Sequence, residues 1–274
     1  MAAAPRPDRG PDWARHGALG LVLLGALALR LWHLGARSLW TDEGSTWTAA
    51  TSSLRELIRL CAEKDASPPF YYLLTSLMTR LGESEAHLRL VSVLASLGLV
   101  WLTYRLARLV AGRGESTLAA ALTALSPFQL MYAQEARTYA LVAFLSVASL
   151  YLFLRAAFLE RPRAWLPYLA VSTLALYTQS IAVLSLGVQG ALALLTQAGR
   201  RSLKRWALAL SACAALYLPW LFVTVQQMSR LSHSHWYLAP PGEHGVFQVL
   251  RAVFLSPVPL IATPAGAQVP GSPP

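Results

Sequence analysis

The sequence predicts an all-α protein, a polytopic bundle of about seven transmembrane helices with further helices lying in the membrane interface. Apolar residues make up 55% of the chain and charged residues only 13%, whereas a soluble domain is about one quarter charged. Apolar runs close to the ~20 residues that cross a bilayer recur along the chain. Basic residues fall in short clusters between those runs, which is typical of membrane topology.

The apolar runs define the expected spans. They lie near 17–36, 87–110, 115–133, 138–158 and 205–225, with a double-length run at 164–198. The run at 164–198 contains the polar break Tyr177-Thr178-Gln179-Ser180, so we expect two short helices joined by a tight turn. We expect residues 1–16 to be a cytoplasmic tail, 17–255 to be the transmembrane domain, and the Pro- and Gly-rich residues 256–274 to be a disordered tail.

The first apolar run has two interpretations. Basic residues before an apolar stretch also occur in cleaved signal peptides. Here the run continues through Leu29-Arg30-Leu31-Trp32, beyond the usual apolar region of a signal peptide. Retention as a membrane anchor is therefore the favoured interpretation.

The distribution of Lys and Arg predicts the orientation. Alternate connections carry the basic clusters, namely Arg6, Arg9 and Arg15, then Arg105, Arg108 and Arg113, then Arg155, Arg161 and Arg163, and finally Arg200, Arg201, Lys204 and Arg205. These connections are expected to be cytoplasmic, with the N-terminus on that side. The net charge of +10 is thus explained by topology, and nucleic acid is not an expected partner.

Residues 37–86 form the expected first external loop. Apolar positions recur at helical spacing in 43–62 and again in 70–81, separated by the break Ser67-Pro68-Pro69. Both segments are predicted to be helices lying in the membrane interface. Asp42 falls where the first of them should begin, so its carboxylate could be a helix cap. Capping does not call for a second acid, Glu43, beside a bilayer, and a functional role stays open.

Four blocks of this sequence resemble the polyprenyl-phosphate-dependent glycosyltransferases of the GT-C superfamily, in particular the protein-mannosyltransferase-like and aminoarabinose-transferase-like group. The blocks are Leu34 to Glu43 (LGARSLWTDE), Ser67 to Leu74 (SPPFYYLL), Ser126-Pro127 with Tyr132 to Ala140 (YAQEARTYA), and Tyr217 to Leu221 (YLPWL) followed by Gln226-Gln227. Each block is weak alone, but the four occur in the family's order.

The resemblance implies transfer of a sugar from a polyprenyl-phosphate donor to a lipid, glycan or protein acceptor on the non-cytoplasmic face, with inversion. It implies that Asp42 is the base that takes the proton of the acceptor hydroxyl. Glu43 would orient the acceptor or Asp42, or pair with a cation. The expected location of such a protein is a bacterial plasma membrane.

Further residues in these blocks are candidates for binding the substrates. Arg137 is the candidate for the donor phosphate, although it could instead only snorkel to the interface. The other candidates are Glu135, Tyr139, Tyr71, Tyr72 and Gln179. Gln179 stands where relatives often have histidine, and Ser67 stands where they have histidine or lysine. No metal ligands or cofactor are firmly implied, although Asp42, Glu43 and Glu135 could hold a divalent cation.

Two alternatives remain. Relatives typically continue for several more spans, so the chain could be a truncated or inactive relative that acts as a non-enzymatic membrane protein or scaffold. A transporter should carry ionisable groups at mid-membrane, whereas here the acids cluster outside the spans. Convergence of Asp42, Glu135 and Arg137 in one externally open cavity would favour the transferase.

Overall fold

The computed structural model describes residues 12–65 and 67–233, and within this part every regular element is a helix. The α-helices are α1 (Asp12–Leu31), α2 (Thr41–Thr51), α3 (Leu54–Glu63), α4 (Phe70–Thr79), α5 (Glu85–Ala107), α6 (Arg113–Leu125), α7 (Pro127–Ala133), α8 (Tyr139–Ala157), α9 (Trp165–Thr178), α10 (Val183–Leu195) and α11 (Gln197–His233). Short 3₁₀ turns, η1 (Pro162–Ala164) and η2 (Ser180–Ala182), precede α9 and α10. The predicted all-α bundle is confirmed. The predicted tail at 256–274 lies outside the described residues.

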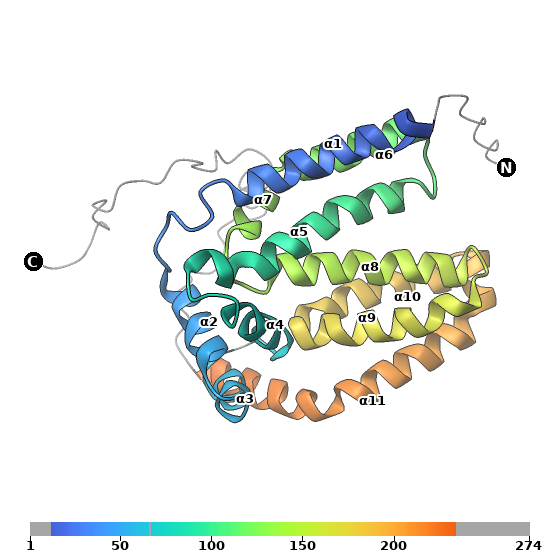
Figure 1. Cartoon of the computed structure of the whole chain (residues 1–274). Helices are drawn as coiled ribbons and strands as arrows, with labels where there is room; N and C mark the ends of the chain where they lie inside the picture. The colour runs from blue at the N-terminus through green and yellow to red at the C-terminus, as the bar shows by residue number, and fades with distance from the viewer. Residues whose placement is uncertain (1–11, 66, 234–274) are drawn as a thin grey trace, which may run out of the picture.

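The long helices lie side by side in the bundle. Helix α5 packs between α6 and α8, α8 packs on α9, and α11 covers α9 and α10 (Figure 1). The largest apolar cluster joins α2, α3 and α4 to α5, α8, α9 and α11. The external-loop helices are therefore fastened to the bundle by a shared core.

Three described helices are long and apolar enough to cross a membrane, namely Glu85–Ala107, Tyr139–Ala157 and Gln197–Ser229. Two further apolar helices, Gly17–Leu31 and Ser180–Leu195, are shorter. Seven full-length spans are therefore not confirmed. The turn predicted within 164–198 is present, since η2 separates α9 from α10.

The expected span at 115–133 is broken into α6 and α7 at Ser126-Pro127. Pro127 has no backbone N–H to continue the helical ladder. Ser126 starts the next helix by accepting a hydrogen bond from the backbone N–H of Gln129 at 3.5 Å. The break turns the chain at the end of the bundle just before residues 134–138.

The external loop contains three helices where two were predicted. The expected helix at 43–62 is divided because Ser52 and Ser53 are extended, and Ser53 caps α3 by accepting a hydrogen bond from Glu56 N at 3.4 Å. Helix α3 buries Leu57 and exposes Leu54, which suits the predicted interfacial position. Helix α4 goes further into the fold, because Tyr71 and Tyr72 are fully buried.

The two ends of the bundle differ in what they carry. The connections α5–α6, α8–α9 and α10–α11 lie at one end, while α2, α3, α4 and α7 lie at the other (Figure 1). The first end holds the basic residues Arg108, Arg113, Arg161, Arg163 and Arg200. The segregation has the pattern that the positive-inside rule describes.

An arginine is fully buried where α1, α5 and α6 meet. Arg30 is 0% exposed. Its Nε donates to Ser96 Oγ at 2.9 Å, and its Nη1 donates to the carbonyls of Ala26 and Ala124 at 3.0 and 3.2 Å. The Ala124 carbonyl lies in the last turn of α6, where a positive charge is favoured by the helix dipole. Arg30 thus holds α1 against the α6–α7 break.

Candidate active site

Helix α2 carries the two adjacent acids in its first turn. The helix begins at Thr41, and the preceding Trp40 makes no side-chain cap. Asp42 is therefore one residue inside the helix, where an anion still gains from the helix dipole, and the capping interpretation is wrong. The side chain of Asp42 is 44% exposed, and its Oδ2 lies 4.0 Å from Nη2 of Arg137.

Arg137 lies at the centre of the site. Its Nη1 donates to Asp42 O at 3.3 Å, to Asp65 Oδ2 at 3.5 Å and to Tyr72 OH at 3.5 Å. These contacts are long, and the buried Nε atom has no partner among the described residues. The side chain is only 12% exposed, so Arg137 does not merely snorkel to the surface.

The surroundings of Arg137 keep it positively charged. Burial acts to lower the pKa of its guanidinium, but Tyr72, Asp65 and Asp42 together outweigh burial and raise that pKa above its ordinary value. The arginine therefore remains a cation at every physiological pH. A cation with long contacts and an unused buried donor can accept an anionic group.

Asp65 belongs to this cluster and was not among the predicted site residues. Its Oδ2 accepts a hydrogen bond from Tyr72 OH at 2.7 Å, and its Oδ1 accepts one from Ser67 N at 2.9 Å. The backbone of Asp65 is fixed from the far end of the chain, because Gln227 Nε2 donates to Asp65 O at 2.8 Å. The available signal was an acid two residues before the Ser67-Pro68-Pro69 block.

The second acid of the pair, Glu43, has a different environment from Asp42. Its two carboxylate oxygens accept hydrogen bonds from Arg89 Nε and Nη2 at 2.8 and 2.7 Å. The Oε1 atom also accepts from Ala136 N at 2.7 Å. Glu43 is 1% and Arg89 2% exposed. Of the roles expected for Glu43, the pairing with a cation is the one observed, and the pairing engages both carboxylate oxygens.

The Glu43–Arg89 pair ties four segments together. Arg89 Nη1 donates to the carbonyls of Leu34 and Arg37 at 2.6 and 3.1 Å. The pair therefore joins the segment before α2, α2 itself, α5 and the α7–α8 connection. A bidentate, fully hydrogen-bonded pair of this kind fixes geometry more than it adds stability.

The segment 134–138 is a turn, so Glu135 and Arg137 are not placed by helical spacing. Burial, with Glu43 as the next contribution, raises the pKa of Glu135 above its ordinary value. Glu135 lies in the same electrostatic environment as Arg137, Arg89 and Arg37. Its expected direct contact with a sugar remains a prediction.

Tyr71 and Gln179 support the segment that carries Arg137. The OH of Tyr71 lies 2.8 Å from Ser92 Oγ, which in turn donates to Arg137 O at 3.3 Å. Gln179 Oε1 accepts from Thr138 Oγ1 at 3.3 Å. Tyr71 is fully buried, so it positions backbone in this structure. Direct substrate binding by either residue stays a prediction.

Tyr72 and Tyr139, the two remaining tyrosine candidates for substrate binding, differ in exposure. Burial and Asp65 raise the pKa of Tyr72, so its hydroxyl stays a neutral donor. Tyr139 is 37% exposed and packs edge-on against Tyr132 with ring centroids 4.8 Å apart. Of the two, Tyr139 has the more accessible ring for a ligand.

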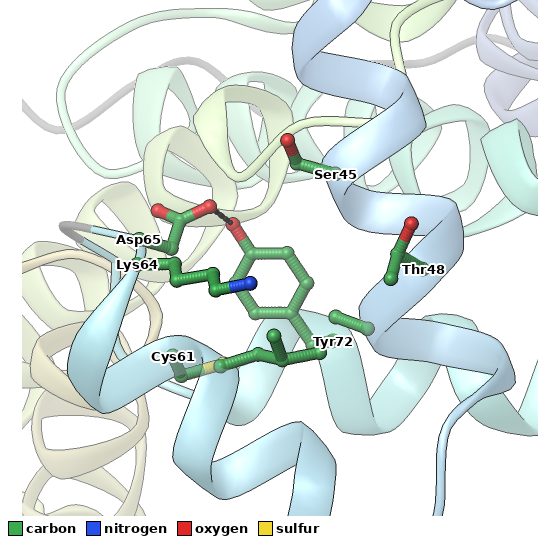
Figure 2. Close-up of a pocket in the computed structure, with 8 residues that line it drawn as sticks. Ser45, Thr48, Cys61, Lys64, Asp65 and Tyr72 are labelled. Atoms are coloured by element: carbon green, nitrogen blue, oxygen red, sulfur yellow. Dashed lines mark hydrogen bonds between the residues drawn. The ribbon is translucent and has the colours of Figure 1, made fainter.

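A pocket of about 230 Å³ opens beside Asp65 and Tyr72, between α2 and α3 (Figure 2). Ser45 and Thr48 contribute hydroxyls from α2, and Lys64 contributes an ammonium group from the end of α3. Ser45 lies three residues after Asp42, so the two share a face of α2. The pocket thus adjoins the Asp42–Arg137 cluster.

The carboxylates considered for a divalent cation do not form a site for one. Within the described residues, no group of three or more His, Cys, Asp or Glu side chains lies together. Both oxygens of Glu43 are engaged by Arg89, so Glu43 does not fit the expected set with Asp42 and Glu135.

Together, an all-helical membrane bundle and an Asp–Arg cluster at the end remote from the basic connections define the class of protein, a multispanning membrane protein with a polar site at one end of its bundle. Residues 66–224 match the family model described as dolichyl-phosphate-mannose-protein mannosyltransferase. The chain belongs to that family. A comparison with curated protein sequences gave no match.

The fold has a counterpart among solved structures. ArnT from Cupriavidus metallidurans, determined in the apo state, superimposes with a TM-score of 0.66 over 88% of this chain at 19% sequence identity. The chain spans 49% of the length of that protein. The likeness concerns the fold.

Proposed function

We propose that this protein transfers a sugar from a polyprenyl-phosphate donor to an acceptor at the non-cytoplasmic membrane surface, with inversion at the sugar carbon. The observation that carries the proposal is the meeting of Asp42, from α2, with Arg137, from the α7–α8 connection, 95 residues apart in sequence. One supplies an accessible carboxylate and the other a fixed cation. A single displacement at a phosphate-linked sugar requires these two groups.

In the proposed reaction, Asp42 accepts the proton of the acceptor hydroxyl as its oxygen attacks the anomeric carbon. The bond between that carbon and the phosphate oxygen breaks, and the electron pair leaves with the lipid phosphate. Arg137 stabilises the charge growing on the phosphate. Because its Nε has no partner among the described residues and its other contacts are long, Arg137 retains N–H donors for the phosphate.

An apolar groove supports a lipid-linked donor. It has a volume of about 260 Å³ and lies between α4, α5 and α8, with Leu74, Val91 and Phe144 in its wall. Leu141, four residues after Arg137, also lines it. A prenyl chain in this groove would bring its phosphate towards Arg137 while the chain remains in contact with the bilayer.

The localisation belongs to the same proposal. We place the basic end of the bundle in the cytoplasm and the end with α2, α3 and α4 outside, in a bacterial plasma membrane. The acceptor would be a lipid, a glycan or a protein. The competing candidate is an inactive relative that acts as a membrane scaffold.

The test is sugar transfer by the full chain reconstituted in liposomes with radiolabelled polyprenyl-phosphate sugars. We expect transfer by the wild type and at least a hundredfold loss in Asp42→Asn, the lower end of the contribution of a general base. Thr51→Ala, an exposed change on the same helix, is the matched control. Folded wild type without transfer from any donor in the panel would favour the scaffold.

A second pair of variants tests the phosphate role. Arg137→Lys keeps the charge but loses the planar fork, whereas Arg137→Gln loses the charge. Transfer should fall in the order wild type, Arg137→Lys, Arg137→Gln, with the larger effect on the KM for the donor. Equal KM values for the donor in all three would contradict phosphate binding by Arg137.

A further inference from the structure

The pocket between α2 and α3 is lined by neither Asp42 nor Arg137, the residues assigned to proton transfer and phosphate binding, and its lining is chemically mixed. Its rim carries the hydroxyls of Ser45 and Thr48 and the ammonium group of Lys64 (Figure 2). The buried residues Ala49 and Cys61 and the partly buried Leu60 form its apolar floor.

The rim offers both donors and acceptors. Ser45 and Thr48 donate their hydroxyl protons within α2, to Thr41 O at 3.4 Å and Gly44 O at 2.9 Å, which leaves their oxygen lone pairs for a ligand. Among the described residues, no carboxylate forms an ion pair with Lys64, which leaves its three N–H groups available. Asp65 supplies a carboxylate that is already held in place by Tyr72 and Ser67.

The floor remains neutral. Burial raises the pKa of the Cys61 thiol to about 12, with Asp65 adding to that effect. Cys61 is therefore a small apolar side chain at physiological pH and not a nucleophile. A ligand in this pocket meets hydrogen-bonding groups at its edge and carbon and sulfur atoms beneath it.

From this arrangement we infer that the pocket between α2 and α3 binds one sugar ring through Ser45, Thr48, Lys64 and Asp65. A pyranose or furanose ring has hydroxyls around its edge and C–H groups on its faces, which matches the rim and the floor. The pocket holds about the volume of seven or eight water molecules at ~30 Å³ each, enough for one ring. An anion is disfavoured because the carboxylate of Asp65 lines the pocket, and a prenyl chain is disfavoured by the polar rim.

The inference rests on the proposed function for its meaning but not for its test. The ring has two sources, namely the sugar carried by the lipid donor or a sugar at the end of a glycan acceptor. Both would lie beside Asp42, because Ser45 follows it by one helical turn on the same face. The residues that recognise the ring are the same in either case.

The test uses thiol protection in the full chain reconstituted in liposomes. The two native cysteines are buried, so the background of maleimide labelling is low. Ser45→Cys and Thr48→Cys place a thiol at the exposed rim, and Ser84→Cys places one on an exposed site outside the pocket. Labelling rates are measured with a panel of methyl glycosides of hexoses, pentoses and aminopentoses, and with inorganic phosphate and a short serine peptide for comparison.

We expect at least one methyl glycoside to slow labelling of both rim thiols threefold or more at roughly 10 mM, because a ligand of about a dozen non-hydrogen atoms binds in the millimolar range. Labelling at Ser84→Cys should not change. Adding Lys64→Gln or, separately, Asp65→Asn to Ser45→Cys should weaken the protection. The two changes are independent, so misfolding of one variant does not remove the test.

Several outcomes would overturn the inference. These are protection by no glycoside, equal protection at Ser84→Cys, or protection by inorganic phosphate or the serine peptide alone. Protection without sugar transfer would support sugar binding in the pocket and count against the proposed function. Sugar transfer without protection would support the proposed function and count against sugar binding in the pocket. If the protecting sugar is also the transferred one, the pocket holds the donor sugar, and if it differs, the pocket holds the acceptor.

Discussion

At the scale of single residues, the adjacent acids Asp42 and Glu43 have different environments and different roles. Asp42 is open to solvent and faces Arg137, while Glu43 is buried against Arg89. Removing one partner of a buried pair leaves an unpaired charge, which costs about 3–5 kcal/mol. Glu43→Gln should therefore lower the free energy of unfolding by that order, measured by denaturant titration in detergent micelles.

The matched control for Glu43→Gln is Asp42→Asn, a change of the same kind one residue away on an exposed side chain. It should change the free energy of unfolding by about 1 kcal/mol or less. If Glu43→Gln unfolds like the wild type but no longer transfers sugar, Glu43 acts on the substrate directly and its assignment as a positioning residue is wrong.

Glu135 should make stability depend on pH. Its pKa in the folded protein lies above the ordinary value of 4.5 because burial and Glu43 disfavour its charge. The protonated carboxyl group of Glu135 contributes to the free energy of unfolding. This contribution is fully present below the ordinary pKa and is lost as the pH rises through the raised pKa. From pH 4 upwards, wild type should lose stability relative to Glu135→Gln, measured by unfolding of both at each pH. A constant difference would contradict the raised pKa.

At the scale of elements, α11 and α3 are joined by one side chain. Gln227 Nε2 donates to the carbonyls of Cys61, Ala62 and Asp65, at 2.8, 3.3 and 2.8 Å. Gln227→Leu would remove this donor from the carbonyls of Cys61 and Asp65, at a cost of about 1–3 kcal/mol. We expect lower stability and a weaker protection of the Thr48→Cys thiol, because Asp65 is released.

Another glutamine of α11 provides the comparison for that experiment. Gln197 is exposed, and Gln197→Leu should leave both the unfolding free energy and the thiol protection near wild-type values. If the two leucine variants behave alike, the clamp between α11 and α3 does not position the site.

The elements also show how far sequence reasoning reaches. Local chemistry was sufficient for the turn between α9 and α10, where a polar stretch interrupts an apolar run. It was insufficient at Ser52-Ser53 and Ser126-Pro127, because helical periodicity continues across both breaks while the backbone does not. Asp42 and Arg137 were identified from the order of motifs. Asp65 and Arg89 were missed because their roles come from partners far away in sequence, Arg137 and Glu43, and a sequence pattern does not encode such pairings.

At the scale of the whole molecule, the two ends of the bundle should face opposite compartments. Gly114 lies at the basic end and Ser84 at the end with the site, and both are exposed. A side chain at Gly114 meets nothing within 4 Å. In intact cells, a membrane-impermeant maleimide should label Ser84→Cys at once and Gly114→Cys only after permeabilisation. The reverse pattern would place the site in the cytoplasm.

The buried Arg30 bears on the order in which the protein is made. One of its acceptors, the carbonyl of Ala124, lies 94 residues further along the chain, and Ser96 lies 66 residues further. Helix α1 therefore leaves the ribosome and meets the translocon long before those partners are synthesised. In that interval the guanidinium can reach the headgroups from its place one residue before the end of α1. The arginine becomes enclosed only once α5 and α6 arrive, so the assembly of the bundle is coupled to the withdrawal of one charge from the membrane surface.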